Sequence, residues 1–183
     1  MRFAQSFVAA ALAIVATAAA AAPEIAVGGK VPASFTAIDA SGKARTLASI
    51  MGKKGTVLVF FRSARWCPFC QAQLKEMKGL QAPLAAKGYT LAAISYDPPE
   101  ALAKFAGAQG LGYTFLSDSK SAMIDAFGLR DTAYAPGSFA DGVPRASTLI
   151  ISPKGEVRWK TVATDYKIRP QNAAILAAVD GLK

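Results

Sequence analysis

Two cysteines separated by two residues are the part of this chain best suited to chemistry. They lie in Trp66-Cys67-Pro68-Phe69-Cys70 and are the only two cysteines among 183 residues. Residues i and i+3 at the start of a helix share one face, so two such thiols can cycle between dithiol and disulfide. Unpaired backbone N–H groups and the positive end of the helix dipole stabilise a thiolate there. The spacing therefore predicts a redox pair in which Cys67 ionises more readily than a free thiol.

Three other uses of a cysteine pair fit this chain less well. A zinc site needs four ligands, usually Cys or His, and the chain has two cysteines and no histidine. Haem attachment needs a histidine directly after the second cysteine, where Gln71 stands. A structural staple that closes so short a loop would stabilise the fold by only about 2 kcal/mol. We therefore predict no metal and no organic cofactor, because a Gly-x-Gly-x-x-Gly run is also absent.

Hydrophobic patterning predicts the elements that position the pair. The continuous apolar run 55–61 is typical of a buried central strand, and it leads directly into the cysteines. A helix is expected from Pro68 to about Lys87, with Pro83 bending it or ending it early. Its core stripe consists of Leu74, Met77, Leu80 and Leu84.

The rest of the chain alternates between strands and helices. We expect an N-terminal hairpin from 31–39 and 44–47, strands at 89–96, 114–116, 147–152 and 156–162, helices at 97–110, 118–128 and 170–181, and a loop at 130–144. This alternation predicts an α/β fold, with a mixed central sheet covered by helices on both faces.

The first 21 residues have the features of an export signal. Arg2 supplies a positive start, residues 7–21 are apolar, and Ala19-Ala20-Ala21 fits the small-x-small cleavage rule. The alternative is a membrane anchor, since 3–23 is uncharged and nearly long enough to span a bilayer. We predict a cleaved signal peptide over 1–21 and one domain over 22–183. The protein is then periplasmic or otherwise exported, without stable membrane insertion after cleavage. In such an oxidising compartment, a lone close pair of cysteines is expected to cycle.

Basic residues outnumber acidic ones, 21 to 12, and the formal net charge is +9. They are scattered, without a block of five or six like charges, which predicts a solvated basic surface that includes Arg62, Arg65 and Arg169. An acidic partner or an anionic membrane surface stays open. Nucleic acid is not an expected partner of an exported protein.

Four passages follow one another in an order known from a protein family. They are 27–35, which contains Gly-x-x-x-Pro-x-Phe, then 60–70 with the cysteines, 142–151, and Pro153-Lys154-Gly155. On these residues the chain resembles the redoxin branch of the thioredoxin superfamily over about 26–181. That branch joins peroxiredoxins of the alkyl hydroperoxide reductase and thiol-specific antioxidant type with exported thioredoxin-like proteins. The resemblance implies a thioredoxin-like (redoxin) domain.

The resemblance to peroxiredoxins is incomplete at the site. These proteins carry Pro-x-x-x-Thr-x-x-Cys, and with Cys70 as the peroxidatic cysteine, Ser63 replaces the proline and Cys67 the threonine. Their site arginine corresponds to Arg145, which lies one residue early relative to Thr148.

The resemblance to thioredoxins is incomplete as well. The cis-proline that faces their cysteines is replaced by Ser147, and the carboxylate six residues before the first cysteine is replaced by Phe61. From both comparisons, the residues expected to support the cysteines are Trp66, Pro68, Arg145 and Ser147.

Three functions follow from these residues. The first is thiol–disulfide oxidoreduction, in which an exposed Cys67 attacks a protein disulfide and the more buried Cys70 resolves the mixed disulfide. The second is thiol peroxidation, in which Cys70 attacks a hydroperoxide, Arg145 stabilises the anion and Cys67 resolves. The third is a non-catalytic binding module on the same scaffold. The enzymatic alternatives require an upstream electron donor or acceptor, and their substrates are protein thiols and disulfides or a hydroperoxide.

Overall fold

A seven-stranded mixed sheet forms the centre of the molecule, in the order β2-β1-β5-β4-β3-β6-β7. The structure, a computed structural model, describes residues 22–182. The strands are β1 (Thr36–Asp39), β2 (Ala44–Thr46), β3 (Gly55–Phe60), β4 (Tyr89–Ser95), β5 (Thr114–Ser117), β6 (Ser147–Ile151) and β7 (Val157–Val162). β3, β4 and β5 run parallel, and the remaining pairs are antiparallel. The predicted mixed α/β sheet is confirmed.

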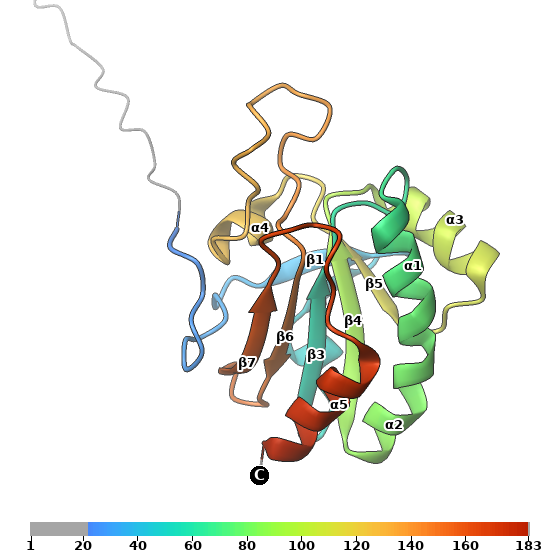
Figure 1. Cartoon of the computed structure of the whole chain (residues 1–183), viewed down its shortest axis with the longest axis vertical. Helices are drawn as coiled ribbons and strands as arrows, with labels where there is room; N and C mark the ends of the chain where they lie inside the picture. Colours follow the sequence, from blue (N-terminus) through green and yellow to red (C-terminus); the bar gives the residue numbers. More distant parts are fainter. Residues whose placement is uncertain (1–21, 183) are drawn as a thin grey trace, which may run out of the picture.

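Helices cover both faces of this sheet. They are α1 (Pro68–Glu76), α2 (Gln81–Ala86), α3 (Pro99–Gln109), α4 (Ala122–Ala126) and α5 (Asn172–Gly181), with 3₁₀ turns η1 (Ala48–Ile50) and η2 (Met77–Leu80). One core cluster joins the sheet to α1, α2, α3 and α5 and includes both cysteines. The other joins it to α4 and η1. Figure 1 shows α1 and α5 on the same side of the sheet that contains β3.

The helix after the cysteines is interrupted, as Pro83 predicts. α1 ends at Glu76, and a 3₁₀ turn over Met77–Leu80 separates it from α2. Pro83 has no N–H, so it cannot donate to the carbonyl four residues earlier, at Gly79. The predicted core stripe is nevertheless continuous, since its four residues are all buried: Leu74, Met77, Leu80 and Leu84.

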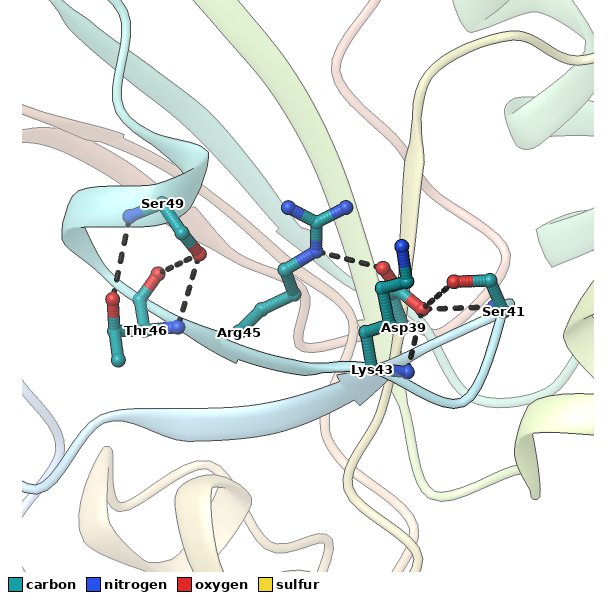
Figure 2. Close-up of polar contacts among 6 residues, drawn as sticks. All are labelled: Asp39, Ser41, Lys43, Arg45, Thr46 and Ser49. Atoms are coloured by element: carbon teal, nitrogen blue, oxygen red, sulfur yellow. Dashed lines mark hydrogen bonds and ion pairs between the residues drawn. The ribbon is translucent and has the colours of Figure 1, made fainter.

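The N-terminal hairpin is shorter than predicted, because 31–35 is not part of β1. Its turn is closed by Asp39, whose carboxylate accepts hydrogen bonds from the backbone and hydroxyl of Ser41 and the backbone of Lys43 (Figure 2). Arg45 Nε donates to its other oxygen at 2.7 Å. Burial opposes these contacts, but together they hold the pKa of Asp39 well below its usual range.

Two further predictions concern the ends and loops of the chain. Residues 130–144 contain no helix or strand, as expected, and Figure 1 shows this loop (orange) rising beyond the end of the sheet. The predicted signal peptide, 1–21, lies outside the described residues. Within 22–182, no helix is long and apolar enough to cross a membrane.

Candidate active site

Three segments meet at the edge of the sheet where β3 ends. Phe60 at the end of β3 pairs with Ser147 at the start of β6, and Ser147 pairs with Val162 at the end of β7. The turn 61–67, the loop 129–146 and the segment 163–171 therefore begin or end side by side. Residues distant in sequence thus come together around the cysteines.

Cys67 and Cys70 form a disulfide at the start of α1, with their Cα atoms 5.2 Å apart. Cys67 is the N-cap residue, and its sulfur accepts the Cys70 N–H at 3.3 Å. Pro68 occupies the first turn of the helix, where its missing N–H leaves no hydrogen bond unmade. The hydrogen bond from the Cys70 N–H shows that the start of the helix directs a backbone donor at Cys67 Sγ. That Cys67 ionises more readily than a free thiol stays a prediction.

The expectation of an exposed Cys67 is wrong. Cys67 is 1% exposed and Cys70 is fully buried. Both sulfurs belong to the core cluster beneath α1, because the turn 61–67 folds inward and places Ala64 and Cys67 against it. A protein disulfide therefore cannot reach Cys67 without movement of the surrounding segments.

An arginine from the C-terminal segment contacts the second sulfur. Nη2 of Arg169 lies 3.7 Å from Cys70 Sγ, and its Nε donates to Oε1 of Gln73 at 3.1 Å. Burial, together with the positive charge of Arg62, lowers the pKa of Arg169 to about 10. Arg169 therefore remains a cation at neutral pH, next to the atom that becomes a thiolate on reduction.

Arg62 is buried too, which corrects the prediction that it lies on a solvated surface. It is 2% exposed, and its guanidinium lies over the rings of Trp66, Tyr134 and Tyr166. Arg65, by contrast, is exposed as predicted. Tyr134 comes from the 130–144 loop and Tyr166 from the segment after β7, so both segments belong to the site.

Arg145 makes its contacts elsewhere. Its Nη2 donates to Glu24 at 2.7 Å and to the Gly128 carbonyl at 3.0 Å, on the side of the sheet that α4 covers. Neighbouring residues of an extended segment point to opposite faces, so Ala146 is directed toward the side of the cysteines. Within residues 22–182, the only arginine that hydrogen-bonds a cysteine sulfur is Arg169.

Trp66 and Ser147 lie at the rim of the site. Trp66 is half-buried, donates from Nε1 to the Tyr96 hydroxyl at 2.9 Å and packs edge-on against Phe139. Ser147 donates to the Arg145 carbonyl at 2.9 Å. Trp66 also packs against the core cluster that contains both cysteines, and Ser147 restrains the backbone where the loop enters β6.

A cavity of about 290 Å³ opens beside these residues. Its lining includes Ala146, Thr148, Ile168 and Arg169. The hydroxyl of Thr148 is buried and has no hydrogen-bond partner among the described residues. The cavity is large compared with the roughly 30 Å³ that one water molecule occupies, so a small polar molecule fits beside the Arg169 guanidinium.

Sequence reasoning missed Gln73, Tyr134, Tyr166 and the role of Arg169. None lies in a motif. Gln73 lies in α1 three residues after Cys70, whereas Tyr134, Tyr166 and Arg169 reach the site through contacts over a long sequence distance. Arg62 carried a weak signal, because it directly follows the buried strand β3 and precedes the cysteines.

A disulfide of the Cys-x-x-Cys type at the start of the helix after a central strand defines a thiol-based oxidoreductase of thioredoxin-like fold. The model of the AhpC/TSA family matches residues 27–160. The chain belongs to this family.

Individual relatives and a solved structure agree with this family assignment. Rv2521 of Mycobacterium tuberculosis, classed as a peroxiredoxin, is 32% identical over 142 residues, covering 78% of this chain and 85% of its own length. Peroxiredoxin Bcp of Escherichia coli K12 is 30% identical over 122 residues, covering 67% and 77%. The crystal structure of peroxidoxin BcpB from Mycobacterium tuberculosis has the same fold, with a TM-score of 0.74, 23% identity and coverage of 87% and 99%.

Proposed function

We propose that this protein is an exported thiol peroxidase that reduces hydroperoxides, with Cys70 as the attacking thiolate and Cys67 as the resolving thiol. The observation that carries this assignment is the Arg169 guanidinium 3.7 Å from Cys70 Sγ. A cation at that distance favours the thiolate over the thiol. The same cation would stabilise the negative charge that develops on the departing peroxide oxygen.

The reaction needs two thiols and one reductant. The Cys70 thiolate attacks the outer oxygen of the hydroperoxide, the O–O bond breaks, and the other oxygen leaves as an alcohol or water after taking up a proton. Cys70 is then a sulfenic acid. The Cys67 thiol displaces water from it and forms the Cys67–Cys70 disulfide, which is the form of the site in this structure. A dithiol donor returns the pair to the reduced state.

Burial favours a small substrate. With Cys67 1% exposed and Cys70 fully buried, a hydroperoxide that enters beside Arg169 needs less rearrangement than a folded protein that presents a disulfide. The names of the peroxiredoxin relatives support the same substrate class.

Thiol–disulfide exchange is the second candidate. The hydrogen bond from Cys70 N–H to Cys67 Sγ supports it, because it favours Cys67 as the thiolate. In that reaction Cys67 attacks and Cys70 resolves, and the cysteines exchange roles relative to the peroxidase.

Single-cysteine variants separate the two candidates. In Cys67→Ser, hydrogen peroxide should produce one sulfenic acid on Cys70, trapped by dimedone and located by mass spectrometry. In Cys70→Ser, no sulfenic acid should form at low peroxide and peroxide consumption should cease. The peroxidase assignment is wrong if the sulfenic acid appears only on Cys67, or if Cys70→Ser accumulates a mixed disulfide while wild type leaves peroxide unconsumed.

A further inference from the structure

Two cationic side chains lie together at the redox pair. Arg169 contacts Cys70 Sγ, and Arg62 is near enough for its charge to depress the pKa of Arg169. Among the ion pairs formed within residues 22–182, none includes either arginine. The disulfide form of the site therefore holds two positive charges that no carboxylate pairs with, although the charge of Asp165 is near enough to raise the pKa of Arg169 against the effect of burial.

Aromatic rings hold Arg62 in place of a carboxylate. Its guanidinium carbon lies 5.2 Å from the ring centre of Trp66, 5.1 Å from that of Tyr134 and 4.5 Å from that of Tyr166. One Nη donates to the Tyr134 hydroxyl, while Nε is buried and has no partner among the described residues. We call Trp66, Tyr134 and Tyr166 the aromatic cage.

The aromatic cage stabilises the cation but does not neutralise it. Ring quadrupoles attract a guanidinium and exclude water from it, whereas a carboxylate would pair with it and cancel its field. Because Arg62 is 2% exposed, solvent and salt screen it weakly. Its charge thus remains available to a negative group formed nearby.

We infer that Arg62, held in the aromatic cage, is a positioning residue that acts alongside Arg169 to raise the reduction potential of the Cys67–Cys70 disulfide. This inference rests on the proposed assignment of Cys70 as the thiolate. Among the described residues Arg62 makes no hydrogen bond to either sulfur, so it acts through its charge.

The electron balance shows why the cations favour reduction. Two molecules of glutathione supply two electrons and become oxidised glutathione, and the Cys67–Cys70 S–S bond breaks. Of the two protons that the glutathione thiols release, Cys67 takes one and becomes a thiol, the other passes to solvent, and Cys70 is left as a thiolate. The negative charge exists only in the reduced state, so the arginines stabilise that state and not the disulfide.

The test is the equilibrium of the full-length protein with defined ratios of reduced to oxidised glutathione, measured by thiol labelling. Arg62→Met should lower the equilibrium constant for reduction about tenfold, which corresponds to a potential about 30 mV lower. Arg62→Lys keeps the charge and should recover most of this loss. Arg65→Met is the matched control, because Arg65 is exposed in the same turn, and it should change the constant less than twofold.

Salt separates an electrostatic effect from a structural one. The effect of Arg62→Met should persist in 0.5 M sodium chloride, since the charge is buried. The inference is overturned if Arg62→Met is folded, as judged by circular dichroism, and leaves the equilibrium constant within twofold of wild type. It is equally overturned if the equilibrium constant of Arg62→Lys is as low as that of Arg62→Met.

A second variant serves if Arg62→Met does not fold. Tyr166 is 42% exposed, so Tyr166→Leu removes one ring of the aromatic cage at the surface and admits water to the guanidinium. It should lower the constant two- to threefold, and an unchanged constant would contradict the inference. The equilibrium contains no peroxide, so its outcome is independent of the peroxidase test above.

Discussion

Asp97 accepts a hydrogen bond from the hydroxyl of Ser63 at 2.8 Å, which ties the residues after β4 to the turn that carries the redox pair. The same carboxylate accepts the Ala64 N–H at 2.7 Å and the Ser95 hydroxyl at 3.0 Å. Burial raises the pKa of Asp97, although these hydrogen bonds act to lower it. Ser63 stands where peroxiredoxins carry a proline, so here hydrogen bonds to a buried carboxylate restrain the turn.

We expect Asp97→Ala to destabilise the protein by about 2–4 kcal/mol, because it leaves buried donors at Ser63 and Ala64 unpaired. Urea unfolding followed by circular dichroism measures this change. Asp131→Ala is the matched control, since Asp131 lies in the 130–144 loop and caps only a local turn, and it should change stability by less than 0.5 kcal/mol. Equal losses in the two variants would contradict the role assigned to Asp97.

Asp118 should make stability depend on pH between about 4 and 6. Burial raises its pKa to about 6, although the backbone N–H groups of the first turn of α4 oppose this shift. In that interval the folded protein holds a proton that the unfolded chain has lost, so stability falls as pH rises and levels off above the folded pKa. Asp118→Asn removes this titration while keeping an acceptor for the Ile124 N–H.

The stability of wild type relative to Asp118→Asn should therefore fall by roughly 2 kcal/mol between pH 4 and pH 7. Unfolding curves at several pH values provide the measurement, with Asp131→Asn in the 130–144 loop as the control. A difference that is constant over this range, or that grows with pH, would show that Asp118 does not titrate as described.

Arg145 and Arg169 can be distinguished by activity. Arg145 pairs with Glu24, so Arg145→Met should reduce stability by up to about 1 kcal/mol and leave peroxide consumption within twofold of wild type. Arg169→Met removes the cation at Cys70 and should lower consumption by about 10²-fold. Assays with dithiothreitol as reductant measure both. If Arg145→Met is the variant that loses activity, the site arginine is the one that the family resemblance indicates.

The export proposal predicts a mature protein that begins at Ala22. The basis is Arg2, the apolar stretch after it and the small residues at 19–21. Mass spectrometry of protein recovered from the periplasm of an expressing bacterium should show this N-terminus. Ala19→Asp should block processing, with Ala10→Val in the apolar stretch as the control that is still cleaved. Recovery of an intact Met1 in the membrane fraction would favour the anchor instead.

The local part of this protein follows from the sequence alone. The strand over 55–61, the helix that starts at Pro68 and its interruption before Pro83 all depend on patterns within a few residues, and the structure contains each of them. The positions of Cys67 and Cys70 at the helix start also depend only on a local pattern. Even the family could be named, because the Cys-x-x-Cys stretch is contiguous and the other three passages precede or follow it in the family's order.

The surroundings of the sulfurs were decided by the tertiary structure. Arg169 lies 99 positions from Cys70 along the chain and reaches it only because β7 pairs with β6, which in turn pairs with β3. Arg62 appears exposed by residue type, but the loop that carries Tyr134 and the segment that carries Tyr166 pack against its guanidinium and bury it. Cys67 is expected to be exposed from its local pattern, but the turn 61–67 folds inward and places it in the core cluster. Periodicity reports which side of its own element a residue occupies. Which distant segment covers that side depends on strand order and register, and no local pattern in the chain encodes these.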